Sequence, residues 1–353
     1  MRIERFDPKA DTGHLRACFE MTQAGWPVDH PDQGPWAVAP FAGKWGPGFD
    51  GAPRQAWLAT DGSGQRVGSY LLRLPDRENV TLADCTLIVP PGSRRRGIGS
   101  ALLEHCSGQA RQAGRSRLVS DARDGSPGAS FASAAGAHGG IPAIIRTLTI
   151  DDGMRARHAG LREGAEPCAA GYQLVSWLGQ TPDEFVDQVA RVHSAMADAP
   201  RDAGVEPATW DGDRVRHGDK TLVEHGLTGY SIAARHERSG QLAALTQLCT
   251  QPDAPDWGFQ QITAVRGEHR GHRLGLLVKL AMLDLLGEHE PDVRHIETSN
   301  AGENAHMIAI NEQLGFTITG VGRHWELDLA GDGGGIDPAA RAVIPAATAN
   351  PYS

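Results

Sequence analysis

The sequence predicts an α+β chain made of two tandem copies of one domain, each with a mostly antiparallel sheet flanked by helices. A strand, a basic glycine-containing turn and an apolar helix occur twice, over residues 85–106 and again over residues 263–283. Short strands and helices fill the rest of each half, which is typical of this fold class. The length of 353 residues allows two domains of ordinary size. The repeat offset of about half the chain makes that division specific.

The first copy is predicted to occupy residues 1–152. A strand at residues 2–6 precedes a helix at residues 14–24, where apolar residues recur at near-helical spacing. Residues 26–51 are rich in Pro, Gly and Trp and are predicted to be a long loop of the kind that often lines a binding pocket. The later elements are strands at 55–60, 67–74 and 80–89, a helix to about residue 113, a strand at 117–121, a helix at 130–135 and a strand at 144–150.

Residues 153–170 carry several charges together with Gly and Pro, and they are predicted to be a linker. The second copy, residues 171–330, opens with a strand, and Thr181 followed by Pro is predicted to start its first helix. Its other elements are strands at 230–235, 242–250 and 258–265, a helix at 274–286, a strand at 295–298, a helix at 304–313 and closing strands at 316–329. Residues 331–353 lack periodicity and are predicted to be a disordered tail.

Composition and charge exclude several classes of protein. The net charge of −9 argues against a general nucleic-acid or membrane-surface binder. Five cysteines without a Cys-x-x-Cys pair indicate reduced thiols, and no zinc-ligand spacing appears, so no metal is expected. There is no signal-peptide pattern and no apolar stretch of the ~20 residues that span a bilayer. We expect a cytoplasmic monomer or homodimer with no nucleic-acid or membrane partner.

The repeated turn has the features of an anion-binding site. Residues 94–100 read RRRGIGS between an apolar strand and a helix. Backbone N–H groups at a helix start point toward an anion, and the helix dipole favours negative charge there. Gly97 and Gly99 remove side chains so that the backbone can close on a ligand. A basic helix start on a solvated surface is the alternative, but the preceding strand and the second copy favour ligand binding.

Residues 94–99 resemble the Arg/Gln-x-x-Gly-x-Gly/Ala acyl-CoA signature of the GNAT superfamily of N-acyltransferases. The second copy has Arg270 and Gly275 at the outer positions of this motif, but Arg273 stands where the inner glycine belongs. Residues 304–316 resemble the closing helix and Gly-Phe turn of the family. The resemblance extends over almost the whole chain apart from the tail, as two tandem GNAT-like domains.

The resemblance implies a site for acetyl-CoA, or another acyl-CoA, in each copy. In the family, the strand before the turn splays from its neighbour at a bulge and pairs with the pantetheine arm, and a main-chain N–H polarises the thioester. By position, the resemblance assigns to the cofactor Leu87, Ile88, Val89, Arg94, Arg95, Arg96, Gly97, Ile98, Gly99 and Ser100 in the first copy and Thr263, Ala264, Val265, Arg270, Gly271, His272, Arg273, Leu274, Gly275 and Leu276 in the second. The cationic character of the second turn favours binding there despite Arg273.

The catalytic residues follow less directly from the motif. Many family members place a Tyr on the closing helix as general acid, but the matching residues are Asn311 in the second copy and Ala132 in the first. The amides of Asn304 and Asn311 can hydrogen-bond a thiolate without donating a proton to it, and Asn304 is equally suited to cap a helix. Candidate bases are Asp84 in the first copy and Glu297 in the second, although either can be an ordinary polar strand residue.

The richer polar set places the chemistry in the second copy, with Glu297, Asn304 and Asn311 as the predicted catalytic residues. The first copy is then expected to hold coenzyme A or to support the fold. Direct attack on a well-placed thioester needs little acid–base help. An acyl-enzyme on Cys85 or Cys249 is disfavoured because buried cysteines are rarely nucleophilic.

The leading interpretation is an acyl-CoA-dependent N-acyltransferase, in the simplest case an acetyltransferase, that acts on the amine of a small molecule in a ternary complex. A catalytically silent acyl-CoA-binding or regulatory protein is the alternative that the missing Tyr suggests. A peptide-bond-forming aminoacyl transferase is a third possibility, which the acidic charge and the intact first turn disfavour. Residues 26–51 and 199–210 are expected to shape the acceptor pocket.

Overall fold

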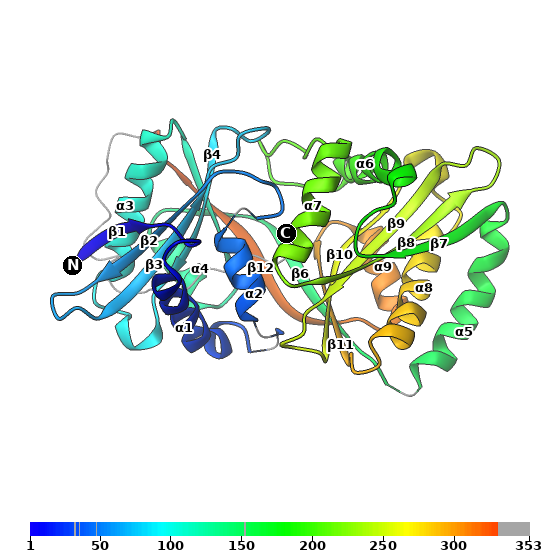
Figure 1. Ribbon diagram of the computed structural model, residues 1–353, viewed down its shortest axis with the longest axis horizontal. Helices are drawn as coiled ribbons and strands as arrows, with labels where there is room; N and C mark the ends of the chain where they lie inside the picture. Colours follow the sequence, from blue (N-terminus) through cyan, green and yellow to red (C-terminus); the bar gives the residue numbers. More distant parts are fainter. Residues whose placement is uncertain (32, 35, 47, 152, 331–353) are drawn as a thin grey trace.

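The computed structural model describes residues 1–330 apart from residues 32, 35, 47 and 152 (Figure 1). A 12-stranded sheet runs through this part of the chain in the order β1-β2-β3-β4-β5-β12-β6-β11-β10-β9-β8-β7. Figure 1 shows an elongated molecule with the first half of the chain mainly at one end and the second half at the other. The predicted α+β class with two tandem domains is confirmed.

The first half contains a meander of antiparallel strands between two groups of helices. Its elements are β1 (Arg2–Phe6), α1 (Thr12–Asp29), α2 (Val38–Trp45), β2 (Arg54–Thr60), β3 (Arg66–Arg73), β4 (Leu82–Ile88), α3 (Ile98–Gln112), β5 (Arg117–Arg123), α4 (Pro127–Ala134) and β6 (His138–Thr149). The prediction of a loop at residues 26–51 is wrong in part, because α1 extends into it and α2 lies within it. Trp26, Phe41 and Trp45 are buried in one apolar cluster, and that burial stabilises both helices.

The second half repeats this plan with an added helix. Its elements are α5 (Met154–Ala165), β7 (Tyr172–Leu178), α6 (Val186–Ser194), α7 (Gly212–Glu224), β8 (Thr228–His236), β9 (Leu242–Thr250), β10 (Trp257–Val265), α8 (Leu274–His289), β11 (His295–Ala301), α9 (Ala305–Leu314) and β12 (Thr317–Asp328). Thr181 does not cap a helix, because its backbone N–H and its hydroxyl both donate to Asp219 of α7. The first long helix, α6, therefore begins only at Val186.

The segment predicted to be a linker, residues 153–170, contains helix α5. Met154 and Ala165 at the two ends of this helix are buried in the core cluster of the second half. Burial of these side chains explains why a charged, Gly-containing segment is helical. The predicted tail, residues 331–353, lies outside the described residues.

The last strand of each half lies against a strand of the other half. Strand β12 pairs antiparallel with β5, joining Gly322–Asp328 to Arg117–Arg123. Strand β6 pairs antiparallel with β11, joining Ala143–Thr149 to His295–Ala301. Because β6 and β12 also pair with each other, the sheet is continuous across the two halves. The ranges 1–152 and 171–330 thus divide the chain in sequence, but the two halves share one sheet.

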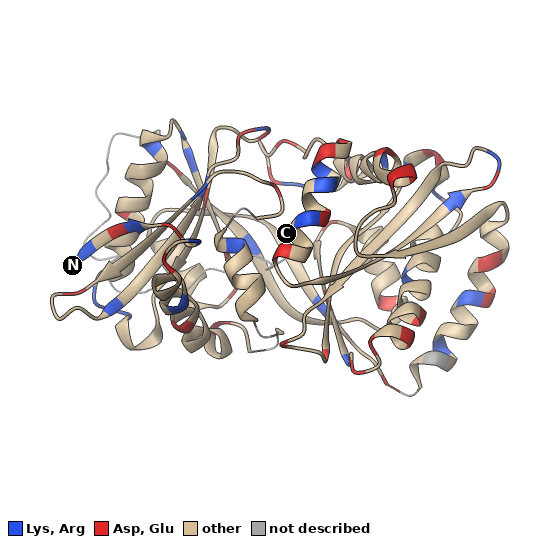
Figure 2. Ribbon diagram, in the orientation of Figure 1, with Lys and Arg blue, Asp and Glu red and all other residues tan. Residues whose placement is uncertain are grey.

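Apolar clusters lie on both faces of the sheet in each half. In the first half, α3 packs on one face and α1 with α2 on the other. In the second half, α8 packs on one face and α6 with α7 on the other. Charged residues of both signs are interspersed along both halves (Figure 2). Among the described helices, none is long and apolar enough to cross a membrane.

Candidate functional site

A gap opens in the sheet of each half just before the glycine-containing turn. The parallel pairing of β4 with β5 covers only residues 82–84 and 117–119, although both strands continue for four more residues in the described structure. In the second half, β10 and β11 are likewise paired only at residues 257–259 and 295–297. The splayed strands expected near Leu87 and near Thr263 are therefore present in both halves.

The bulge expected beside each gap occurs in the second half alone among the described strands. The register of β10 against β9 shifts between Gln260 and Ile262, and the Gln260 side chain donates to the carbonyl of Gln247 at 2.6 Å within this bulge. The register of β4 against β3 runs from Asp84 to Ile88 without a shift. The splay of β4 from β5 thus arises without an extra residue in β4.

The two turns have the same backbone shape, but Arg and Gly change places at their two left-handed positions. Arg95 and Gly97 have left-handed φ values of 66° and 76°, and the corresponding pair in the second turn is Gly271 at 87° and Arg273 at 54°. A Cβ on Gly97 would meet no atom within 4 Å, so this backbone is open to a ligand. The exposed Arg273 side chain extends toward α5, since its Nη1 lies 3.9 Å from the Cβ position of Gly164. Arg273 therefore neither blocks its own turn nor changes its shape.

Arg94 is held by an ion pair inside the protein. Its Nη2 lies 2.6 Å from Oδ2 of Asp29 at the end of α1, and its Nε donates to the carbonyl of Val89 at 3.0 Å. The side chain is only 10% exposed, so this guanidinium fastens the turn to α1 rather than facing solvent. Arg95 and Arg96 are exposed and form the accessible positive charge of the first turn.

A cavity of about 50 Å³, which we call the first slot, lies on the α3 face of the gap between β4 and β5. Cys85 and Leu87 of β4 line it, together with Ser120 and Ala122 of β5. The side that α4 contributes is formed largely by small residues, namely Gly128, Ala132 and Ala135. These small residues keep a small cavity open beside the splayed strand.

In the second half, larger side chains take the corresponding positions. Counting back from the Gly that follows each closing helix pairs Gly128 with Met307, Ala132 with Asn311, Ala135 with Leu314 and Ala137 with Phe316. Leu314 and Phe316 are buried in the core cluster, and Met307 packs against it. Lys279, at the position of Leu103, is 3% exposed with its Nζ 4.9 Å from the Phe316 ring centroid. Side chains of the protein fill the region equivalent to the first slot.

Two adjoining cavities lie between the halves, on the sheet face opposite the first slot. Their volumes are about 640 and 530 Å³, and we call them together the inter-half cavity. Alternation along β4 directs Asp84 and Thr86 to this cavity and Cys85 and Leu87 to the slot. The residues that line both adjoining cavities are Asp50, Arg73, Asp84, Arg214 and His324.

The inter-half cavity has a charged wall formed by the first half and β12. Asp84 makes no hydrogen bond or ion pair with any described residue, and burial raises its pKa. His324 of β12 lies 2.5 Å from Asp121 through Nδ1 and Oδ1, and this hydrogen bond and charge raise the pKa of His324 to about 9. At neutral pH His324 is therefore a cation. Burial lowers the pKa of Lys44, which reaches the cavity from α2.

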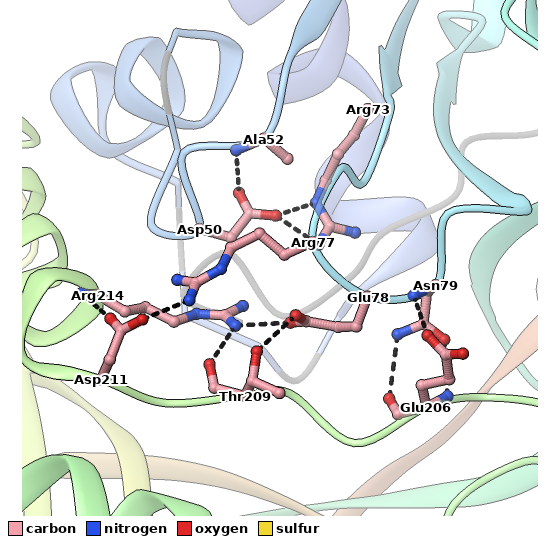
Figure 3. A network of polar contacts seen from close by, with 10 residues as sticks. All are labelled: Asp50, Ala52, Arg73, Arg77, Glu78, Asn79, Glu206, Thr209, Asp211 and Arg214. Atoms are coloured by element: carbon pink, nitrogen blue, oxygen red, sulfur yellow. Dashed lines mark hydrogen bonds and ion pairs between the residues drawn. The ribbon is translucent and has the colours of Figure 1, made fainter.

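A polar network beside the cavity joins the two halves (Figure 3). The residues that pair across the two halves are Arg214 and Thr209 with Glu78, Arg77 with Asp211, and Asn79 with Glu206. Arg214 and Glu78 are nearly buried, with 10% and 13% of their side chains exposed, and their Nη1–Oε1 distance is 2.6 Å. Asp50 accepts from Arg73 and Arg54 on the first-half side (Figure 3 shows Arg73). This network fixes residues 206–214, which overlap the segment 199–210 expected to shape the pocket, against the loop after β3.

The three predicted catalytic residues are separate in the structure. Glu297 is buried under Gln33 of the first half, whose Nε2 donates to Oε1 at 3.4 Å, and burial raises its pKa to about 7. Its Oε2 has no hydrogen-bond partner among the described residues. Asn304 caps α9 by accepting from the backbone of Met307 at 3.3 Å.

Asn311 is fully buried and donates to Oδ1 of Asn300 at 2.7 Å. The residues that sequence reasoning missed are Lys44, Arg73 and His324 of the cavity wall. Lys44 lay in a segment predicted to be a loop, and His324 reaches this wall only because β12 crosses to β5. The alternation of side chains along β12 places His324 and Trp325 on opposite faces of the sheet. The strand that pairs with β12 cannot be identified from the sequence around β12 alone.

The splayed strands, the glycine-containing turn and the flanking helices are those of the GNAT fold. Residues 15–129 match the family described as acetyltransferase (GNAT) family. The chain as a whole is a tandem GNAT protein in its fold. It is similar to a tandem GNAT protein from the clavulanic acid biosynthesis pathway, with 29% identity, coverage of 94% of this chain and 99% of that chain, and a TM-score of 0.78.

Two more distant structures share the fold. The GCN5-related N-acetyltransferase from Sphaerobacter thermophilus is 13% identical, with coverage of 93% and 95% and a TM-score of 0.65. N-myristoyltransferase from Saccharomyces cerevisiae is 11% identical, with coverage of 93% and 80% and a TM-score of 0.59. A search among curated protein sequences finds no significant match.

Proposed function

We propose that this chain transfers an acetyl group from acetyl-CoA, held by the first half, to the amine of a small molecule in the inter-half cavity. The observation that carries the proposal is that the first slot and the inter-half cavity lie on opposite faces of the sheet and adjoin the same gap. Ser120 of β5 lines the slot, while its neighbour Asp121 lines the cavity. On β12, Trp325 lines the slot and its neighbour His324 lines the cavity. A donor and an acceptor can thus approach from opposite sides.

The first turn and the first slot fit coenzyme A. The backbone at Gly97 is open, and Arg95 and Arg96 offer exposed positive charge for phosphates. The Oγ of Ser100, in the first turn of α3, is buried and has no hydrogen-bond partner among the described residues. Acetyl-CoA, when bound, supplies the thioester acetyl group. The pantetheine arm is proposed to enter at the first slot, beside the small residues of α4, and the slot of about 50 Å³ must widen to hold it.

Asp84 is the residue best placed to take a proton from the incoming amine. It lies at the last paired position of β4, directly before the gap, and faces the cavity. Its raised pKa brings a carboxylate closer to the range in which a general base is effective. The positive charges of Arg73, Lys44 and His324, which also line the cavity, favour the ionised form of Asp84. This assignment replaces the expectation that chemistry takes place in the second half.

Two features support the first half over the second as the donor site. The region equivalent to the slot is filled by Phe316, Lys279 and Leu314, and Gln33 covers Glu297. We therefore propose that Asn304 and Asn311 stabilise α9 and its contact with β11, and that Glu297 is not the base. Turnover compared between Asp84→Asn and Glu297→Gln tests this assignment: a loss of several powers of ten in the Glu297 variant alone would return the chemistry to the second half.

Donor binding is tested by calorimetry with acetyl-CoA. Ala132→Leu should fill the first slot and weaken binding about tenfold or more, which is ~1.4 kcal/mol per factor of ten. Ala134→Leu is the matched control, since Ala134 is exposed on the same helix. The expected stoichiometry is one acetyl-CoA per chain. Two molecules bound per chain, or unchanged affinity in folded Ala132→Leu protein, would contradict the proposal.

A further inference from the structure

The inter-half cavity contains two charged side chains of opposite sign that form no ion pair in the described part of the chain. One is Asp84, which accepts no hydrogen bond from a described residue, although the charges of Arg73 and His324 act on it. The other is Lys44, whose Nζ lies 5.6 Å from the centroid of the Trp36 ring and forms no ion pair with a described residue. The other charged groups nearby are already paired: His324 with Asp121, Arg73 with Asp50, and Arg214 with Glu78.

Unpaired charges in a partly enclosed cavity cost free energy, so a ligand that pairs both gains affinity. Lys44 and Asp84 attract each other electrostatically without touching. Both line the same cavity, and no ion pair joins them, so a ligand can place one group on each. A single monoamine would pair Asp84 and leave Lys44 unpaired.

The second half contributes an apolar surface to the cavity wall, beside polar residues such as Asp219, Gln247 and Gln261. Val189 and Met196 line it beside α6, Trp210 precedes α7, and Leu248 and Ile262 lie on β9 and β10. The Trp210 ring stacks on His193 with centroids 3.9 Å apart, which holds a flat surface toward the cavity. An apolar or aromatic ligand body suits this wall.

Building on the proposed function, we propose that the acceptor is an amino carboxylic acid with an apolar or aromatic body. Its amine lies at Asp84 beside the gap, its carboxylate binds Lys44, and its body packs against the second-half wall around Trp210 and Ile262. The first half then recognises both charged ends of the acceptor, and the second half selects its apolar part.

The test uses matched pairs of acceptors and measures thiol release from acetyl-CoA. Phenylalanine is compared with phenethylamine, and para-(aminomethyl)benzoate with benzylamine, so that each pair differs only in the carboxylate and the two pairs differ in the spacing of the charges. We expect at least one amino acid to have a kcat/KM about 10- to 100-fold higher than its decarboxylated partner, as a charge-assisted contact provides.

Lys44→Met should abolish this preference by raising KM for the amino acid, with little effect on KM for the plain amine. Lys44→Arg should restore part of it. Lys220→Met is the control, because Lys220 is exposed on α7 and pairs with Glu224 outside the cavity. Acetyl-CoA binding, measured separately by calorimetry, should be equal in all variants. If acetyl-CoA binds but amino acids are used no better than plain amines, this inference is wrong while the proposed function stands. If acetyl-CoA does not bind, the proposed function itself fails.

Discussion

At the scale of single residues, Asp84 and Glu297 show how the environment divides similar carboxylates. Each lies at the last paired position beside a gap in the sheet. Asp84 faces the inter-half cavity, whereas Glu297 is 6% exposed under Gln33. Burial raises the pKa of both. Access to a ligand, rather than the shift of the pKa, therefore separates a candidate base from a buried acid.

The buried Glu297 should make the stability of the protein depend on pH. Its pKa is about 7 in the folded protein and near 4.5 when unfolded, so the folded state binds more protons between these values. The free energy of unfolding should therefore fall as pH rises from about 4.5 to 7, by roughly 3 kcal/mol for this group alone. Glu297→Gln should lack this fall in urea unfolding at pH 5 and pH 8. The same slope in Glu297→Gln and in the exposed control Glu303→Gln would disprove the assignment.

The buried ammonium group of Lys279 should destabilise the folded second half. Burial lowers its pKa from 10.5 to about 7, so the unfolded state binds more protons between these values and stability rises with pH across that interval. Lys279→Met fills the same space without a charge and should raise the free energy of unfolding by about 2–5 kcal/mol near pH 7. Thermal or urea unfolding measures the gain. Lys279→Arg keeps the charge and should be less stable than wild type; a destabilised Met variant would show that the ammonium has a partner.

At the scale of elements, the first turn depends on a helix far away in the sequence. Sequence reasoning identified the turn from its glycines and its flanking strand and helix, because these features are local. It could not foresee that Asp29, at the end of α1, pairs with Arg94 in the interior. Helix α7 was missed for a related reason: its surface is mostly polar, and the few apolar residues that it buries, such as Val215, gain their partners only in the folded molecule.

Breaking the contact between α1 and the turn should lower the stability of the protein strongly and its affinity for the cofactor only weakly. Arg94→Gln or Asp29→Asn leaves a buried charge unpaired and should lower the free energy of unfolding by about 3–5 kcal/mol, while the double variant should lose less than the sum of the two. Acetyl-CoA affinity of the folded Arg94→Gln protein should change less than that of Arg95→Gln, whose side chain is exposed at the turn. The reverse order of affinities in calorimetry would return Arg94 to the pyrophosphate site.

At the scale of the whole molecule, the sequence predicted the two copies and the positions of the strands along the chain. It did not predict that the last strand of each half would pair with a strand of the other half. Strand periodicity sets which residues share a face, and the repeat of the turn sets the length of each copy. The choice of β5 as the partner of β12 depends on contacts between residues about 200 positions apart in the sequence. His324 reaches the candidate site because β12 pairs with β5. The sequence therefore predicted only the part of the site that β4 and the glycine-containing turn form.

The exchange of strands predicts that neither half folds alone. In a fragment of residues 1–152, β5 would lose β12, and β6 would lose both of its neighbours, β11 and β12. Such edges are unpaired backbone that favours aggregation. The intact chain should therefore unfold in urea in a single transition by both circular dichroism and tryptophan fluorescence, since Trp residues lie in both halves. Residues 1–152 and 153–353 should each lack a cooperative transition when produced separately and regain it when refolded together. A fragment of residues 1–152 that unfolds cooperatively, with a denaturant slope in proportion to its size, would show that the first half does not require β12.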